Sequence, residues 1–291
     1  MNIFPLMLFA ATLLLSPFAQ AMNAVMYQPQ LRDMSMSDTQ WQTMLQRLKM
    51  QGIDTLVLQW SRYGDAFSDG ESRTWLEHKA VLAAESNLKL VFGLAADERF
   101  FARQKQPYAA RINYLNRLRA DDIAVATRWI EVLGNAKIAG WYISNELDDL
   151  NWRTPQMQQA ALDWLTKTRL SLTEIANKPV AVSSFFAGNM APDAWAKWVT
   201  TLSHSGVKVW VQDGAGTQML PSAARDLYLK TPSSGQIVEL FRQHKQAADF
   251  HASPLPASQQ RHLLAAPVPA GQDRIFFSLR YMDAAEGILQ R

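Results

Sequence analysis

Eight short apolar runs recur along the chain, and most are separated by longer segments whose apolar residues have helical spacing. The runs cover residues 24–27, 55–60, 88–93, 138–143, 179–185, 207–212, 236–240 and 274–279. Near-continuous apolar strands that alternate with helices indicate parallel pairing with both faces of the sheet covered. Eight such units predict an α/β fold, the (β/α)₈ TIM barrel. The alternative is an open doubly wound sheet, but no Gly-x-Gly-x-x-Gly fingerprint follows the first run.

The segments between the runs predict the helices of this barrel. The clearest helical patterns cover residues 37–50, 75–86, 108–133, 155–176 and 192–203. Residues 252–271 are rich in Pro and Ala with few periodic apolar positions, and we expect a long loop there with no more than one helical turn. Because the chain stops soon after the eighth run, the last helix should be short or missing. No linker composition interrupts residues 22–291, so we expect one barrel domain.

The N-terminal 21 residues are not expected to belong to the fold. Residues 3–15 are apolar, which is shorter than the roughly 20 residues needed to cross a bilayer. Ser16 and Pro17 break the run, and Ala19-Gln20-Ala21 is a small-x-small cleavage pattern, so we expect a secretory signal peptide cut after Ala21. No Lys or Arg precedes the run, which leaves an uncleaved membrane anchor as the alternative. The mature protein is expected to be periplasmic or secreted.

Composition excludes several classes of function. The chain has no Cys, which excludes disulfides, thiolate metal sites and a lipoprotein anchor. Its five His residues have no spacing typical of a transition-metal site, and no phosphate-binding loop is present, so we expect neither metal nor cofactor. A net charge of +3 on 291 residues does not indicate nucleic-acid binding.

Polar side chains gather where the apolar runs end, whereas the run starts carry isolated Lys or Asp residues. The candidates for a site at these ends, with one Tyr inside the fourth run, are Gln28, Gln59, Trp60, Arg62, Tyr142, Asn145, Glu146, Trp152, Asp213, Glu239 and Tyr281. In a barrel of this kind, function lies at the carboxyl ends of the strands. Paired carboxyl groups suit glycoside cleavage, and aromatic rings offer flat apolar faces to sugars. A Trp beside a strand is often core, so Trp60 and Trp152 are open between ligand and core.

The fourth run, Gly140-Trp141-Tyr142-Ile143-Ser144-Asn145-Glu146, resembles the fourth strand of retaining glycosidases built on the (β/α)₈ barrel. In that clan an Asn-Glu pair ends strand four and the Glu is the acid/base, which the resemblance assigns to Glu146. The clan's nucleophile is a Glu near the end of strand seven, and Glu239 falls at the corresponding place.

A resemblance over nearly the whole mature chain is to a bacterial family of exported, glycoside-hydrolase-like barrel proteins with a domain of unknown function. It rests on residues 52–60, 140–148, 178–186 and 212–216. It implies the barrel and a sugar-related role, and some relatives look like accessories of exopolysaccharide synthesis and export systems.

The leading hypothesis is therefore a periplasmic, retaining glycoside hydrolase that acts on a bacterial exopolysaccharide or related glycan. Glu146 would protonate the leaving oxygen, Glu239 would attack the anomeric carbon, and Asn145 would bind the sugar 2-hydroxyl. The expected substrate is a polysaccharide or oligosaccharide, and an export complex in the inner or outer membrane is a candidate partner. The alternatives are a non-catalytic glycan-binding accessory and a structural partner of a membrane glycosyltransferase.

Overall fold

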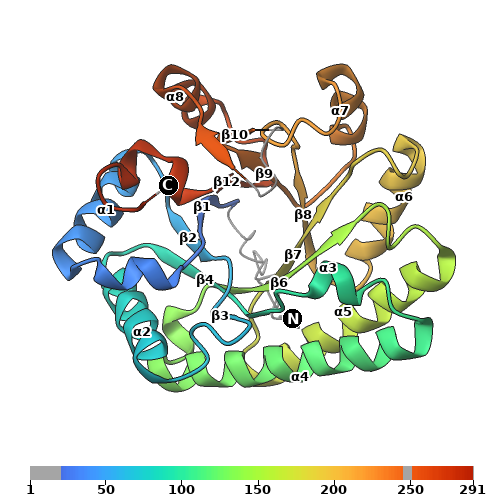
Figure 1. Ribbon diagram of the computed structural model, residues 1–291, viewed down its shortest axis with the longest axis horizontal. Coiled ribbons are helices and arrows are strands. Elements are labelled where there is room, and N and C mark those ends of the chain that lie inside the picture. Colours follow the sequence, from blue (N-terminus) through green and yellow to red (C-terminus); the bar gives the residue numbers. More distant parts are fainter. Residues whose placement is uncertain (1–20, 245–250, 291) are drawn as a thin grey trace, which may run out of the picture.

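The computed structural model describes residues 21–244 and 251–290, and in it eight parallel strands close into a barrel (Figure 1). The strand order around the barrel is β1-β12-β9-β8-β7-β6-β4-β2, so the first and last strands pair and close it. The strands are β1 (Asn23–Tyr27), β2 (Thr55–Leu58), β4 (Lys89–Gly93), β6 (Gly140–Asp148), β7 (Val180–Phe185), β8 (Lys208–Gln212), β9 (Gly235–Glu239) and β12 (Asp273–Phe277). The predicted (β/α)₈ barrel is confirmed.

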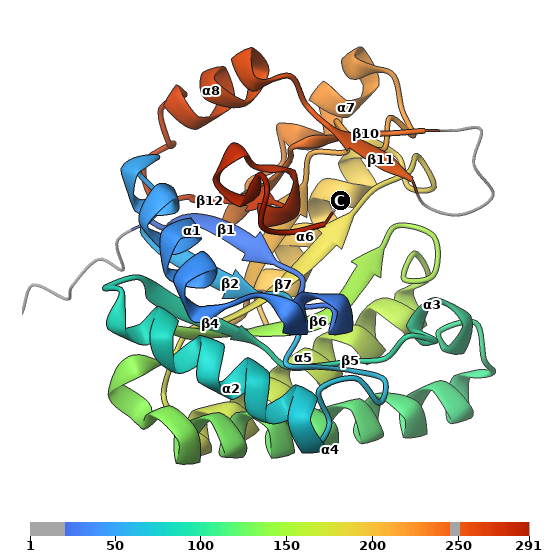
Figure 2. The ribbon, with the colours of Figure 1, turned by 60° about the vertical axis from the view of Figure 1, so that its left-hand side comes forward.

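Helices surround the barrel on the outside (Figures 1 and 2). They are α1 (Asp38–Met50), α2 (Gly70–Glu85), α3 (Phe100–Arg103), α4 (Tyr108–Leu133), α5 (Pro155–Ile175), α6 (Pro192–Ser203), α7 (Ser222–Leu229) and α8 (Ala257–Ala265). Helix α1 begins at a capping box in which the side chains of Ser37 and Gln40 each accept a hydrogen bond from the other's main-chain amide. After β12 the described chain forms two 3₁₀ turns, η3 (Leu279–Tyr281) and η4 (Asp283–Ala285), in place of an eighth long helix.

The loop expected over residues 252–271 is wrong in part. This segment contains β11 (Ala252–Pro254), which pairs with β10 (Phe241–Gln243), and helix α8. The only fully buried residue of α8 is Gln260, whose amide donates to the carbonyls of Leu255 and Tyr281. Because α8 is held by a polar anchor and half-buried leucines, the apolar periodicity that marks the other helices is weak.

The inside of the barrel is filled by one cluster of apolar side chains. They are Ala24, Met26, Val57, Val91, Tyr142, Ala181, Trp210, Ile237 and Ile275, and the rings of Tyr142 and Trp210 stack with centroids 5.5 Å apart. Side chains alternate across a strand, and the next inward position toward the carboxyl end is polar on most strands, as at Gln28, Gln59, Gln212 and Glu239; Gly93 and Phe277 are the exceptions. This alternation carries the barrel from an apolar core to a polar mouth.

Close approach of strands helps to fix this mouth. A side chain at Gly93, the last residue of β4, would come within 2.2–2.3 Å of the main chain of Leu58 and Gln59. Only glycine therefore lets the ends of β2 and β4 lie this close, which sets the position of Gln59.

The predicted signal peptide, residues 1–21, lies outside the described residues except for Ala21. In the described ranges no helix has the length and apolar character required to cross a membrane.

Candidate active site

Glu146 lies two residues before the end of β6, the fourth strand of the barrel in chain order, and Glu239 is the last residue of β9, the seventh. Because all eight strands are parallel, both carboxyl ends open on the same face of the barrel. The pairing of β6 with β7 is irregular between Ile143 and Leu147, which inserts extra residues on the β6 side. Glu146 lies within this irregularity, the kind of feature that re-aims a side chain beside an active site.

The Glu146 carboxyl group is half-buried and is held by two neutral donors. Its Oε1 accepts from the Gln212 amide at 2.8 Å and from the Ser183 hydroxyl at 3.2 Å. The Tyr142 hydroxyl lies 2.8 Å from Ser183 Oγ and supports it from inside the barrel. Burial raises the pKa of Glu146 to about 7; the negative charge of Glu239 adds to this, while the Ser183 and Gln212 hydrogen bonds oppose it.

The Glu239 carboxyl group is only 3% exposed and is held by main-chain donors. Its Oε2 accepts from the amides of Gly216 and Thr217, at 2.6 and 3.0 Å, in the loop after β8. A side chain at Gly216 would come within 2.7 Å of the Phe241 carbonyl oxygen, so this loop needs a glycine there to approach Glu239. Burial raises the pKa of Glu239, and the two amides and the charge of Arg225 oppose that rise.

Asp213 is a third carboxyl group beside this pair. Its Oδ1 accepts from the amides of Ala215 at 2.9 Å and Glu239 at 3.3 Å. Burial, reinforced by the charge of Glu239, raises the pKa of Asp213 to about 7, whereas these amides and Arg225 lower it. The Arg225 guanidinium donates to the Gly214 carbonyl at 3.0 Å and forms no ion pair with Asp213, so its charge offsets only part of the rise in pKa.

Three buried or half-buried carboxyl groups, each with a raised pKa, cannot all ionise readily at neutral pH. None of the ion pairs found among the described residues involves Glu146, Asp213 or Glu239. One group can therefore hold a proton while a neighbour stays ionised, which is the arrangement that acid/base chemistry by two carboxyls requires.

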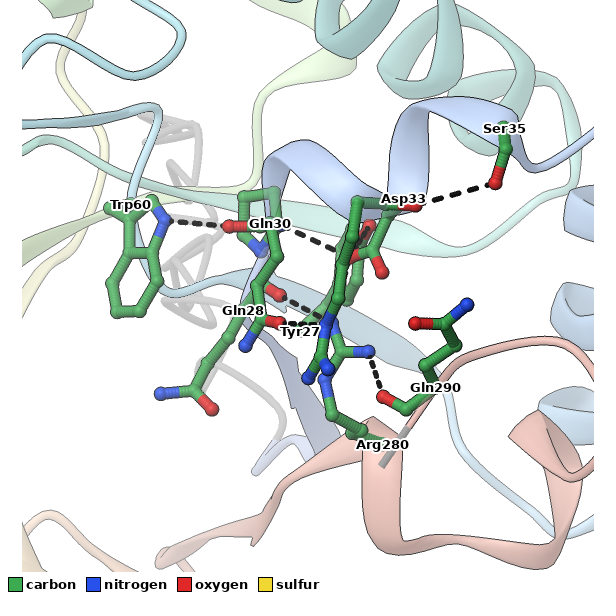
Figure 3. Close-up of polar contacts among 10 residues, drawn as sticks. Tyr27, Gln28, Gln30, Asp33, Ser35, Trp60, Arg280 and Gln290 are labelled. Atoms are coloured by element: carbon green, nitrogen blue, oxygen red, sulfur yellow. Dashed lines mark hydrogen bonds and ion pairs between the residues drawn. The ribbon is translucent and has the colours of Figure 1, made fainter. Parts of the chain in front are cut away.

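Three of the other predicted site residues lie at or near the mouth. Gln59 is buried, and its Oε1 has no hydrogen-bond partner in the described structure. Gln28 is half-buried, and its side chain extends away from the nearby ion pair of Asp33 and Arg280 (Figure 3). Trp60 is half-buried, donates to the Pro29 carbonyl at 3.0 Å, and packs its ring 4.7 Å from that of Tyr63.

Three other predicted site residues are buried and form hydrogen bonds within the protein. Trp152 and Tyr142 have no exposed surface, and Trp152 donates to Gln104 Oε1 at 2.9 Å. The Asn145 amide donates to the Ala95 carbonyl at 3.1 Å and accepts from the Asp97 amide at 3.4 Å. Both ends of Asn145 are thus occupied by the main chain at and just after β5 (Ala95–Ala96).

Arg62 follows β2, and Tyr281 lies in η3, after β12. Arg62 pairs with Asp121 at 2.8 Å and lines a separate polar cavity of about 530 Å³ together with Asp97 and Arg103. Tyr281 is half-buried against Phe241, with ring centroids 5.3 Å apart. Neither residue has a contact with Glu146 or Glu239 among those found.

The sequence reasoning missed several partners of the site. Ser183 and Gln212 could have been found by alternation, because they follow the inward-facing Ala181 and Trp210 by two residues. The main-chain amides of Gly216 and Thr217 could not have been found from side-chain patterns.

Near the mouth, a buried ion pair of Asp33 and Arg280, at 2.7 Å, joins the segments after β1 and β12. The Tyr27 hydroxyl donates to the same Asp33 oxygen (Figure 3).

Within residues 21–244 and 251–290, no group of three or more His, Asp or Glu side chains could hold a metal ion. The fold is a TIM barrel that carries one glutamate near the end of its fourth strand and one at the end of its seventh.

This chain belongs to the family described as "Domain of unknown function (DUF4434)", whose model matches residues 22–285. It is 46% identical to "Uncharacterized protein YbcH" of Escherichia coli (strain K12) over 286 residues, which cover 96% of each chain.

Solved structures with a similar barrel include a "putative alpha-L-fucosidase" from Bacteroides thetaiotaomicron, with a TM-score of 0.62 and 17% identity. That likeness covers 95% of this chain and 91% of the other. A GH113 β-1,4-mannanase is similar at a TM-score of 0.50 and 8% identity, covering 92% of each chain. At these identities the likeness shows a shared fold, and the expectation of a glycoside-hydrolase-like barrel is confirmed.

Proposed function

We propose that this protein is a retaining glycoside hydrolase in which Glu146 is the acid/base and Glu239 is the nucleophile. The observation that carries the proposal is the raised pKa of the Glu146 carboxyl group. Burial raises this pKa to about 7, and the charge of Glu239 contributes to the rise. A carboxyl group that keeps its proton near neutral pH beside a second carboxylate is the requirement for glycosidic cleavage by two carboxyls.

In the first step the protonated Glu146 gives its proton to the glycosidic oxygen, and the bond from that oxygen to the anomeric carbon breaks. The Glu239 carboxylate forms a bond to the same carbon and gives a glycosyl ester. In the second step Glu146, now ionised, takes a proton from water as the water oxygen displaces Glu239. This double displacement retains the anomeric configuration and requires the two carboxyl groups to be about 5–5.5 Å apart.

The hydrogen bonds around the two groups support this division of roles. Gly216 and Thr217 donate to Glu239 and favour its ionised form, as a nucleophile requires. Glu146 receives only an amide and a hydroxyl, which either protonation state of a carboxyl group can accept.

The proposed substrate is a bacterial exopolysaccharide or a related oligosaccharide. The solved structures of similar fold carry the names of a fucosidase and a mannanase, which support a glycan in general terms. Gln59 and Gln28 offer amides, and Trp60 offers a half-buried ring at the mouth. Asp213 would orient the reacting sugar beside Glu239, and Arg62 and Tyr281 would contact the glycan away from the reacting bond.

We also propose that the mature protein starts at Met22 and works in the periplasm or outside the cell. The support is the apolar run of residues 3–15 followed by Ala19-Gln20-Ala21, together with the family match that begins at residue 22. A membrane complex for exopolysaccharide export would be its partner.

The test is turnover of a panel of bacterial exopolysaccharides by purified protein that starts at Met22. New reducing ends are expected from the wild type and from Glu174→Gln, which changes an exposed carboxyl group on α5. Glu146→Gln and Glu239→Gln should each lose on the order of 10³-fold or more of the turnover. Binding of a polysaccharide without any turnover would replace this proposal with a non-catalytic glycan-binding accessory.

A further inference from the structure

A cavity of about 370 Å³ opens beside Glu239, between the loop after β8, the β10–β11 pair and helix α8. Glu239 and Asp213 both line it. If Glu239 attacks the anomeric carbon, whatever fills this space is attached to the reacting sugar or is a close neighbour of it. The cavity is therefore a subsite of the proposed enzyme, and its chemistry reports on the substrate.

The walls of this cavity are mainly apolar. Phe241 and Leu255 are buried and Leu263 is half-buried, and all three line the space. The polar side chains of Gln259 and His262, on α8, and the charged side chain of Arg242, on β10, stand at exposed positions that line the same cavity. The space thus combines an apolar wall with hydrogen-bond donors at its exposed side.

An unmodified sugar matches these walls only with its C–H faces. Any hydroxyl group turned toward Phe241, Leu255 or Leu263 would lose water without gaining a hydrogen bond, which is unfavourable. At roughly 30 Å³ per water molecule, the space holds on the order of ten waters, much more than one methyl group would fill. An O-acyl group fits both observations, because its alkyl part is apolar and its carbonyl accepts hydrogen bonds without donating any.

We propose that this cavity receives the O-acyl substituent of an acylated polysaccharide, next to the sugar that reacts with Glu239. The proposal rests on the proposed glycosidase function. The cavity would make the enzyme prefer acylated over unmodified stretches of the glycan, since the ester group replaces water along an apolar wall.

The probes are exopolysaccharides of the same panel, each in the native O-acylated form and after mild alkaline de-O-acylation. Wild-type kcat/KM is expected to be at least tenfold higher on the acylated form. Leu263→Trp, which fills the cavity, should lose at least tenfold on the acylated form and stay within about twofold on the deacylated form. The matched control Leu170→Trp, at an exposed position of α5, should leave both unchanged.

Equal turnover of both forms by the wild type, or equal loss on both in Leu263→Trp, overturns the subsite proposal and leaves hydrolysis intact. Turnover confined to ester-free polymers of 6-deoxy sugars also overturns it, in favour of a methyl group as occupant. If nothing is hydrolysed, calorimetric binding of the same pairs decides: tighter binding of acylated forms keeps the subsite and removes hydrolysis. No difference in binding for any pair overturns the subsite as well.

A second, independent observation lies at the opposite end of the barrel. The main-chain nitrogen of Met22 donates to Asp273 Oδ1 at 3.1 Å, and Asp273 is only 2% exposed. The other oxygen of Asp273 accepts from Lys208 Nζ at 2.9 Å and from Trp210 Nε1 at 3.0 Å. The Met22 carbonyl accepts from the Arg274 amide at 2.8 Å, so both sides of this residue are tied to β12.

We infer that cleavage after Ala21 converts the Met22 amide into an ammonium group that pairs with Asp273. A charged donor makes a stronger hydrogen bond to a carboxylate than an amide does. The barrel would then gain stability only on maturation, after the leader has been removed. The charged groups around this nitrogen are Asp273, Arg274, Lys208 and Lys89.

N-terminal mass analysis of the exported protein should give Met22 as the first residue. Purified protein that starts at Met22 should melt about 3 °C above the same chain extended by Gly-Ser before Met22, at pH 6–7. We expect the direct hydrogen bond to Asp273 to raise the pKa of the ammonium group more than the charges of Arg274, Lys208 and Lys89 lower it. The difference should therefore vanish as pH rises through that folded pKa, above about 8. Asp273→Asn should remove the difference at every pH.

If Asp273→Asn does not fold, the loss of the difference at high pH alone decides. A mature N-terminus at another residue, or equal melting of the two chains at pH 6–7, overturns the inference.

Discussion

The buried carboxyl groups at the two ends of the barrel differ in whether they have a cationic partner. At the amino end of the strands, Asp273 is paired with Lys208 and held by Trp210. At the carboxyl end, Glu146 and Glu239 receive only neutral donors, and burial raises the pKa of both. At the amino end Asp273 forms an ion pair, whereas none of the ion pairs among the described residues includes Glu146 or Glu239.

This difference teaches which end is built for stability and which for chemistry. A carboxyl group with a cationic partner stays ionised and ties strands together. A carboxyl group without one is costly to ionise, and such groups gather at functional sites because their protons are available near neutral pH. The Asp33–Arg280 pair, near the mouth, shows that the carboxyl end also holds a compensated carboxylate where it joins two segments.

The largest expected effect is on catalysis at the carboxyl end. Glu239→Gln and Glu146→Gln should lower kcat by on the order of 10³-fold or more, since each removes a group that acts on the reacting bond. Steady-state release of reducing ends measures this, with Glu174→Gln as control. Retention of more than a tenth of the activity in either variant would mean that these two carboxyl groups are not the reacting ones.

The next effect is on stability at the amino end. Lys208→Met should lower the free energy of unfolding by about 2–3 kcal/mol, because Asp273 would be left buried with fewer partners. This is below the ~3–5 kcal/mol of a fully buried pair since Lys208 is partly exposed. Denaturant unfolding measures it, and kcat should be unchanged. A loss of kcat without a loss of stability would break the division between the two ends.

A smaller effect, of opposite sign, is expected for Asp213→Asn. The folded pKa of Asp213 is about 7, above the ordinary value of 3.8, so its ionisation weakens the fold as pH rises from about 4 through 7. The Asn variant should therefore be more stable than the wild type at pH 8, by about 1–2 kcal/mol, and equal to it at pH 4. This stabilisation is smaller than the whole pKa shift of Asp213 would give at ~1.4 kcal/mol per unit, because Asp213 is half-buried and water screens its charge. Thermal melts at both pH values test it, and equal stability at pH 8 would contradict it.

The smallest effect sharpens the role of the neutral donors. Ser183→Ala removes a hydrogen bond that lowers the pKa of Glu146, so the alkaline limb of kcat/KM should move to higher pH by less than about one unit. Above that limb the acid is ionised and activity falls about tenfold per pH unit. Ser184→Ala is the matched control, since its hydroxyl donates to the Leu147 carbonyl instead. A shift toward lower pH would show that Ser183 does not stabilise the ionised form.

The strands could be predicted from the sequence because each contains a short apolar run, which can be recognised without knowledge of the neighbouring strands. It was insufficient for α8, whose anchor is the amide of Gln260. The site divides in the same way. Glu146 and Glu239 could be named from their positions at strand ends, whereas Asn145 and Trp152 satisfy buried main-chain or side-chain partners that no local pattern reveals.

By itself the sequence determined the barrel, the placement of Glu146 and Glu239 on one face, and the polar character of that face, because alternation and strand direction are local properties. Only the tertiary structure decided which polar side chains have free surface. It also decided that Glu239 is held by the amides of Gly216 and Thr217, and that burial raises the pKa of three carboxyl groups. The physical reason is that burial and charge depend on segments far apart in the chain, which meet only when the barrel closes.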